Sequence, residues 1–358
     1  MRRKLLERVS RLVVKLGTGV LTDSRKQPDF LQLVQLVAQL AEQRRAGREV
    51  VLVSSGAVGA GMGVLGLARR PAKLDQLQAC AAIGQSRLMA LYGDLFEKFG
   101  LHVAQVLLTH ADLADHYRHL NARNALLTLL DRGVVPIINE NDVVSVEELK
   151  FGDNDRLSAL VAALLPADLL VILTSVEGVV AHYGQPNAHV LPTIERLDPE
   201  IVRWATGTTS PTAVGGMITK IEAARIAMRS GLPLVIASGR KRDVLARILA
   251  GEEEGTLFRP SPAKLQSRKR WIAFFHHPRG SLFVDDGASR ALREQGRSLL
   301  LPGVTRCEGD FDAGEVVGIC DPDGREFARG LAAFGADPIR ARTLPNPEVV
   351  HRDNLVLL

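Results

Sequence analysis

Cysteine is scarce in this sequence. The three cysteines, Cys80, Cys307 and Cys320, lie far apart and form no C-x-x-C pair. This usage argues against a disulfide framework and a zinc site, and it fits a reducing cytoplasm. The 9 histidines form no i, i+4 pair suited to a metal. We therefore expect no metal site built from a cluster of protein side chains.

Long apolar runs are also missing. The opening segment, MRRKLLERVSRLVVKLG, looks briefly like a signal peptide, but charged residues such as Glu7, Arg8 and Arg11 interrupt any apolar core. No later run approaches membrane-spanning length. We therefore expect a soluble, unexported protein without a membrane partner.

Charge of one sign is not concentrated anywhere. The 45 basic residues exceed the 40 acidic ones only slightly and are spread along the chain, so charge alone does not indicate a nucleic-acid partner. The sequence does contain enough apolar residues for a large core, at 46% of 358 residues. This length exceeds that of a usual domain, and we expect one large and one small domain.

Residues 136–158, PIINENDVVSVEELKFGDNDRLS, bring four polar side chains to the entrance of a predicted amphipathic helix: Asp142, Asp153, Asn154 and Asp155. Such an entrance can hold a polar ligand. Its carboxylates would repel a bare anion, so we expect a cation nearby, either Mg²⁺ or an ammonium group on the ligand. The alternative is that Asn139, Asp142 and Asp153 only form turns and cap the helix, although capping needs one such residue and not four.

Strand-like and helix-like segments alternate before Phe258. Short apolar runs predict strands at 12–17, 49–53, 103–108, 134–138, 169–173 and 234–237. Helical periodicity predicts helices at 30–45, 75–98, 121–131, 157–165 and 216–229. This alternation is typical of an α/β fold with a mainly parallel sheet covered on both faces.

Composition changes after Phe258. Residues 259–263, RPSPA, have the composition of a linker. Beyond them, short apolar runs separated by Gly, Asp and Pro predict a small β-rich domain, with strands at 271–275, 281–284, 315–320 and 326–328 and a helix at 286–294. We therefore expect domains at 1–262 and 269–358.

Two common nucleotide motifs do not apply here. Residues 61–66, GMGVLG, match G-x-G-x-x-G, but they lie several residues past their strand and have no acidic residue about 20 positions later. We interpret them as a flexible loop. A Walker-type G-x-x-x-x-G-K-[ST] is absent from the sequence. Any nucleotide must therefore be bound in another way.

Small residues follow predicted strands or open predicted helices at three places: Lys15 with Gly17-Thr18-Gly19, Ser54-Ser55-Gly56, and Gly215 to Lys220. Free main-chain N–H groups at helix entrances bind phosphate. The carboxyl ends of parallel strands share one edge of a sheet, so these turns and residues 153–155 are expected to converge. As alternatives, Lys15 reaches water and Lys220 is an ordinary surface residue. We favour a function for Lys15, because lysine rarely ends an apolar strand.

These segments resemble a known family in order and spacing. They are VVKLGTGVLT at 13–22, VSSGAVGAG at 53–61, PIINENDVV at 136–144, FGDNDRLSA at 151–159 and GGMITK at 215–220. Together they resemble the glutamate 5-kinases of the amino acid kinase superfamily. The C-terminal part, with KRWIAF, VDDGASRAL, GDFDAGEVVGI and DGREFARG, is similar to the PUA domain that many bacterial members carry. The resemblance covers nearly the whole chain.

The resemblance implies a three-layer amino acid kinase fold and phosphorylation of the γ-carboxylate of L-glutamate by ATP, with Mg²⁺, as the first step of proline synthesis. It assigns catalysis to Lys15, Asp155 and Lys220, and glutamate binding to Ser55, Asp142 and Asn154. It assigns ATP binding to Lys15, Thr174, Ser175, Val214, Gly215, Gly216, Met217, Ile218, Thr219 and Lys220. Within this scheme, Asp142 suits an ammonium group and the Asn154 amide suits a carboxylate.

Two places depart from the family pattern. Thr174-Ser175 replaces the usual Thr-Asp, and 180–184, VAHYG, replace Tyr-Thr-Ala-Asp-Pro on the adenosine side of the site. Residues 212–214, TAV, lack the threonine often found beside the paired glycines. Main-chain contacts to the nucleotide are compatible with both changes.

Several alternatives stay open at the level of sequence. A kinase for acetylglutamate, aspartate or a nucleoside monophosphate has the same fold, although the NEND and GDND motifs favour glutamate. The PUA resemblance also allows an RNA-binding protein, but residues 269–358 hold twelve Lys or Arg against thirteen Asp or Glu, a small electrostatic footprint for RNA. The resemblance further suggests a homo-oligomer and feedback inhibition by proline.

Overall fold

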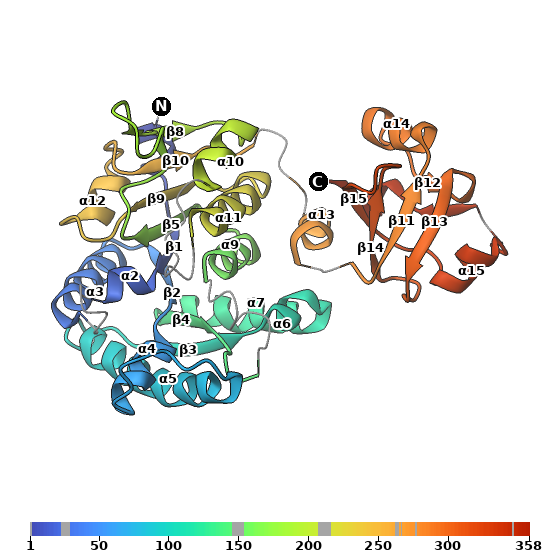
Figure 1. The fold of residues 1–358 in the computed structure, drawn as a ribbon. Coiled ribbons are helices and arrows are strands. Elements are labelled where there is room, and N and C mark those ends of the chain that lie inside the picture. Colours follow the sequence, from blue (N-terminus) through green and yellow to red (C-terminus); the bar gives the residue numbers. More distant parts are fainter. Residues whose placement is uncertain are drawn as a thin grey trace. The chain divides into compact units, whose positions relative to one another are not determined.

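The computed structural model describes residues 2–22, 29–144, 154–206, 216–261, 265, 267–275, 278–345 and 347–358. The chain forms two compact units, Met1–Lys264 and Leu265–Leu358 (Figure 1). Residues 262–264 lie outside the described residues. The domain limits at 262 and 269 therefore stay a prediction.

The first unit is built on an 8-stranded sheet with the order β3-β4-β2-β1-β5-β9-β10-β8. The strands in this order are Val103–Leu108, Val135–Glu140, Glu49–Ser54, Arg11–Leu16, Leu169–Thr174, Leu234–Ser238, Thr256–Phe258 and Thr193–Ile194. Neighbours pair in parallel except β9 and β10, which are antiparallel. The predicted mainly parallel sheet is confirmed.

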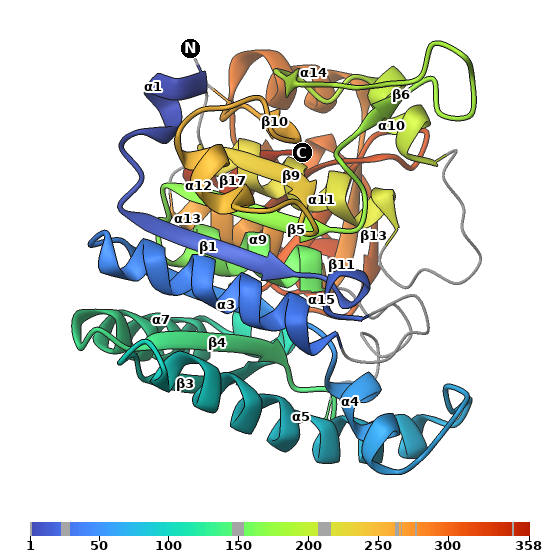
Figure 2. The same ribbon diagram turned by 90° about the vertical axis from the view of Figure 1, so that its left-hand side faces the viewer.

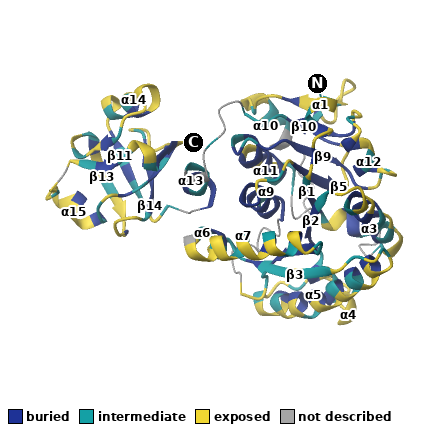
Figure 3. Cartoon of the chain, turned by 180° about the vertical axis from the view of Figure 1, so that it is seen from behind, coloured by how far each residue is buried: buried dark blue, intermediate teal, exposed yellow. Residues whose placement is uncertain are grey.

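Helices cover the sheet on both faces (Figures 1 and 2). On one face, α3 (Phe30–Arg45), α5 (Leu74–Glu97) and α12 (Val244–Leu249) join a buried apolar cluster with alternate residues of β1. On the other face lie α7 (His116–Asp131), α9 (Asn154–Leu164) and α11 (Met217–Arg229). Nearly every residue of α9 is buried, which explains its apolar sequence (Figure 3). The predicted three-layer sandwich is thus confirmed.

The interpretation of residues 61–66 as a flexible loop is wrong, because most of them form the end of α4 (Ala57–Val64). A Cβ on Gly61 would lie 1.9 Å from the carbonyl oxygen of Cys80. A Cβ on Gly84 would lie 1.7 Å from that of Ala57. The glycines therefore let α4 and α5 pack backbone to backbone, which accounts for them without a nucleotide.

The second unit contains a 5-stranded sheet with the order β13-β11-β14-β15-β17. Its strands are Val304–Gly309, Gly280–Val284, Val316–Cys320, Glu326–Leu331 and Leu355–Leu357, and α14 spans Asp286–Gln295. The predicted strand at 271–275 is wrong, since Trp271–Phe275 forms a π-helical turn with four buried residues. A short apolar run does not by itself distinguish a strand from a buried helical turn. The predicted β-rich character of this unit is confirmed.

Candidate active site

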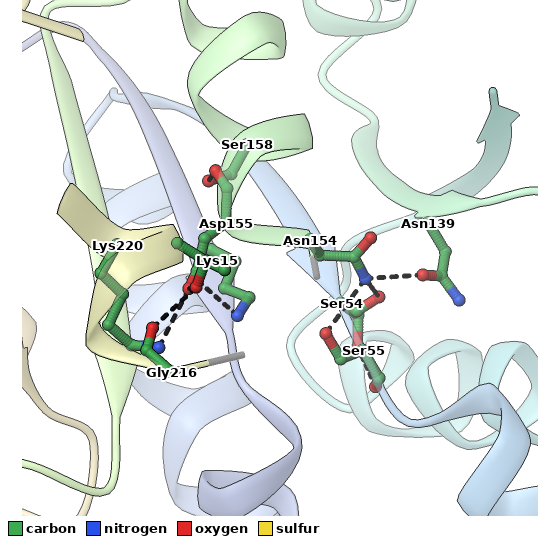
Figure 4. Close-up of polar contacts among 10 residues, drawn as sticks. Lys15, Ser54, Ser55, Asn139, Asn154, Asp155, Ser158, Gly216 and Lys220 are labelled. Carbon is green, nitrogen blue, oxygen red and sulfur yellow. Dashed lines mark hydrogen bonds and ion pairs between the residues drawn. The ribbon is translucent and has the colours of Figure 1, made fainter. Parts of the chain in front are cut away.

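Two strand ends and two helix starts meet at the carboxyl edge of the large sheet. β1 ends at Leu16 and β2 ends at Ser54, while α9 begins at Asn154 and α11 begins at Met217. Hydrogen bonds and ion pairs connect groups at the ends of these four elements (Figure 4). The predicted convergence of these segments is therefore observed for their described residues, and Asp153 lies outside these. The helix α9 starts earlier than predicted, so Asn154 and Asp155 belong to its first turn.

The carboxylate of Asp155 lies between two lysines (Figure 4). Nζ of Lys15 is 2.5 Å from Oδ1, and Nζ of Lys220 is 2.9 Å from Oδ2. Lys15 and Lys220 are 4% and 5% exposed, and Asp155 is 0% exposed. The alternatives that Lys15 reaches water and that Lys220 is an ordinary surface residue are therefore wrong. We refer to Lys15, Asp155 and Lys220 as the ion-pair centre.

The electrostatics of this centre favour an anionic ligand. Burial by itself would raise the pKa of Asp155, but the two neighbouring ammonium groups outweigh burial and hold that pKa well below its ordinary value. Asp155 is therefore ionised at neutral pH. Two lysines against one carboxylate leave an excess of positive charge among these three groups. A phosphate group is the kind of ligand that can balance this charge.

The first turn of α11 faces the same place. Gly216 is the N-cap residue and has no side chain that could accept from the first N–H groups of the helix. Oγ1 of Thr219 lies 2.7 Å from the carbonyl oxygen of Gly216 and 3.1 Å from Oδ2 of Asp155. N–H groups at the start of a helix bind phosphate, and Lys220 brings its charge from the same turn. Val214 and Gly215, which we also expect to bind ATP, lie outside the described residues.

A second cluster of polar side chains surrounds Asn154 (Figure 4). Nδ2 of Asn154 is 2.9 Å from the carbonyl oxygen of Ser54, 3.0 Å from Oγ of Ser55 and 2.8 Å from Oδ1 of Asn139. All four residues are buried. The N–H groups of Asn154, which we expected to hold a carboxylate, thus donate to oxygens of the protein.

Comparison with known proteins supports the kinase resemblance. The model of the amino acid kinase family matches residues 10–238, and the PUA domain model matches residues 280–343. The glutamate 5-kinase of Moorella thermoacetica is 47% identical over 99% of this chain and 98% of its own length. That of Geobacter sulfurreducens is 47% identical over 100% of both chains. The chain belongs to the glutamate 5-kinases of the amino acid kinase family.

Solved structures support the amino acid kinase fold. The structure of carbamate kinase from Giardia lamblia bound to AMP-PNP is 20% identical to this chain and has a TM-score of 0.50. The match covers 71% of this chain and 100% of the carbamate kinase chain. At this identity, the likeness concerns the fold alone. The substrate must therefore be inferred from the glutamate 5-kinase relatives and from the side chains of the site.

The remaining predicted amino acid kinase residues lie around these two clusters. Thr174 is buried at the end of β5, and the exposed Ser175 follows it. Oγ of Ser175 is 3.5 Å from the place where a Cβ on Gly19 would lie, so it adjoins the glycine turn after β1. Asp142 lies half-buried in the turn after β4. The half-buried Met217 and the exposed Ile218 belong to the first turn of α11.

The described site offers few protein ligands to a Mg²⁺ ion, so an ion that enters with the nucleotide would be held mainly by phosphate oxygens and water. Within the described ranges, no three His, Cys, Asp or Glu side chains gather as a metal-binding group. Asp155 is a buried carboxylate of the site, and both of its oxygens are in ion pairs with lysines. Mg²⁺ bound with a nucleotide usually needs only one or two carboxylates beside the phosphate oxygens and water.

Of the described helices, none combines the length and apolar character needed to cross a membrane.

Sequence patterns did not reveal Gln85. It lies in the middle of α5 and is 9% exposed, and its Oε1 is 2.9 Å from Nδ2 of Asn139. An amide on the buried face of a long amphipathic helix is the signal that could have found it. Asn139, considered above as a turn former or helix cap, is likewise a buried member of this network.

Proposed function

We propose that this chain transfers the γ-phosphoryl group of ATP to the γ-carboxylate of L-glutamate. The products are γ-glutamyl phosphate and ADP, and the reaction is the first step of proline synthesis. The observation that carries this proposal is the ion-pair centre, a buried pair of lysines held by one aspartate at the edge of a parallel sheet. Membership in the glutamate 5-kinases supports glutamate as the acceptor.

The reaction requires little acid–base chemistry from the protein. A γ-carboxylate oxygen of glutamate forms a bond to the γ-phosphorus while the bond from phosphorus to the bridging oxygen breaks and ADP leaves. The acceptor is already ionised at neutral pH, so no general base is needed. The protein must instead align the reactants and absorb negative charge on the transferred group.

The described residues divide these tasks. Lys15 and Lys220 place positive charge beside the phosphoryl group, and Asp155 keeps both lysines oriented. The start of α11 binds phosphate through its N–H groups. Mg²⁺, when bound with ATP, supplies further positive charge to the phosphate oxygens. Ser55, Asp142 and Asn154 bind the amino acid.

A substrate screen tests the proposal directly. ADP release is measured with ATP and Mg²⁺ together with glutamate, aspartate, acetylglutamate or uridylate. We expect turnover with glutamate. Turnover with aspartate or acetylglutamate but not with glutamate would overturn the assignment.

The amino-acid side of the site predicts a selective loss of affinity. Asp142→Ala and Asn154→Ala should raise KM for glutamate by about 10-fold or more, because each removes a polar partner of the substrate. KM for ATP should change little. Steady-state kinetics with each substrate varied in turn measure both values, and Asn121→Ala, an exposed site on α7, is the control. A larger rise in KM for ATP would show that the two halves of the site are reversed.

The small unit is not expected to carry the chemistry. All the assigned site residues lie in the first unit, Met1–Lys264. A chain truncated after Lys264 should therefore fold and still phosphorylate glutamate, although its oligomerisation or response to proline could change. Circular dichroism measures whether the truncated chain folds, and ADP release measures whether it phosphorylates glutamate. A well-folded truncated protein without activity at saturating substrates would show that catalysis requires the PUA unit.

Two properties of the family remain predictions for this chain. We expect a homo-oligomer and feedback inhibition by proline. The balance of charges in the PUA unit does not favour RNA binding. A gel shift with structured RNA at several salt concentrations distinguishes this alternative.

A further inference from the structure

A row of side-chain amides leads from β3 through α5 and β4 to Asn154 in α9. Nε2 of Gln85 is 3.3 Å from Oε1 of Gln105. Oε1 of Gln85 accepts from Nδ2 of Asn139 at 2.9 Å, and Oδ1 of Asn139 accepts from Nδ2 of Asn154 at 2.8 Å. Three of these residues, Gln85, Asn139 and Asn154, are buried. Each amide therefore depends on its neighbours for hydrogen-bond partners.

Main-chain groups fix the direction of the hydrogen bonds along this row of amides. The carbonyl of Ser54 can only accept, so the group of Asn154 that lies 2.9 Å from it must be the amide nitrogen. The main-chain N–H of Glu140 can only donate, and it lies 2.9 Å from Oδ1 of Asn139. Asn139 must then present its nitrogen to Gln85. Gln85 must in turn offer an acceptor.

The direction of these hydrogen bonds decides which donor and acceptor groups of Asn154 and Ser55 can bind a ligand. Nδ2 of Asn154 is engaged by three protein oxygens, whereas no described residue donates a hydrogen bond to its Oδ1. Figure 4 shows Oδ1 directed away from those three oxygens. Oγ of Ser55 accepts from Asn154, so the hydroxyl proton of Ser55 stays available as a donor. The site thus presents one acceptor and one donor side by side.

We propose that Gln85 is a positioning residue for the amino-acid substrate. Through Asn139 it holds Asn154 so that a carbonyl oxygen faces the substrate. That oxygen suits an ammonium group, and the hydroxyl of Ser55 suits a carboxylate. The inference rests on the proposed function, since glutamate carries both groups. It also replaces our first expectation that Asn154 binds a carboxylate through its N–H groups.

Two substitutions of similar size separate this role from simple core packing. Gln85→Met removes the acceptor for Asn139, and KM for glutamate should rise about 3- to 10-fold, the effect of one lost hydrogen bond. KM for ATP and kcat should each stay within about 2-fold, because the phosphate side of the site is not touched. The separate variant Gln85→Glu keeps an acceptor oxygen at this place, so its KM for glutamate should stay close to that of the original protein. Gln76→Met, an exposed site on the same helix, is the control.

The outcomes are distinct. An unchanged KM for glutamate in Gln85→Met, an equal rise for both substrates, or an equal defect in Gln85→Glu would each overturn the positioning role. If Gln85→Met does not fold, Gln85→Leu repeats the test, and failure of both to fold would assign Gln85 to the core alone. Absence of glutamate turnover in the unsubstituted protein would instead overturn the proposed function, so the two failures are distinguishable.

Discussion

Alanine at Lys15 or at Lys220 is expected to lower kcat by about 10²- to 10³-fold. Each substitution removes one positive charge from beside the transferred phosphoryl group, where charge develops in the transition state. Asp155 lies within ion-pair distance of both lysines, so either variant leaves it one partner. The fold should therefore survive. Initial rates at saturating ATP and glutamate measure kcat, and circular dichroism checks the fold.

Lys98→Ala is the matched control, because Lys98 is an exposed lysine at the end of α5. It removes the same charge from the protein at another place, so its kcat should be unchanged. Turnover near that of the original protein in both Lys15→Ala and Lys220→Ala would remove the lysines from the mechanism. A large loss in only one variant would identify which lysine contacts the transferred group.

Much of the fold could be predicted, because the spacing of apolar residues along the sequence matches the strands of the sheet and the buried faces of the helices that pack on it. β3 spans Val103–Leu108 and α3 spans Phe30–Arg45, both as predicted. The errors have physical causes. Glycines in α4 indicate a loop by propensity, yet they serve close packing against α5, a tertiary contact that local patterns do not contain. The short run at 271–275 carries no period that separates strand from helix.

The site was predicted in part. Lys15, Asp155 and Lys220 were identified from strand ends, a helix entrance and a family resemblance, and the structure brings them together. The direction of the Asn154 amide could not be predicted. It depends on the Ser54 carbonyl, about 100 residues away along the chain. Gln85 was missed for a similar reason, since its role depends on partners from β3 and β4.

Replacing Asp155 is expected to affect stability more than replacing either lysine. Asp155→Asn leaves two ammonium groups close together in a buried site without their shared carboxylate. Removing one partner from a buried ion pair costs about 3–5 kcal/mol of unfolding free energy. Denaturant unfolding at neutral pH measures this loss. Asp94→Asn, an exposed site on α5, is the control and should change stability by less than about 0.5 kcal/mol.

The pH dependence gives this prediction a second readout. The pKa of Asp155 is lower in the folded chain than its ordinary value, so the unfolded chain takes up the proton more readily. The stability that Asp155 contributes is therefore fully present above roughly pH 5 and is lost as the pH falls below the ordinary carboxyl pKa of about 4. The gap in unfolding free energy between the original protein and Asp155→Asn should be constant from about pH 7 to 5 and narrow in more acidic solution.

A double substitution tests whether charge is the cause. Adding Lys15→Met to Asp155→Asn removes one of the two neighbouring ammonium groups and should restore part of the lost stability. If charge compensation is not the cause, the second substitution should instead lower stability further, because it also removes contacts of a residue that is 4% exposed. A stability gap that does not change in acid would contradict the prediction equally. Recovery in the double variant together with a narrowing gap would establish that Asp155 holds the two lysines in place by its charge.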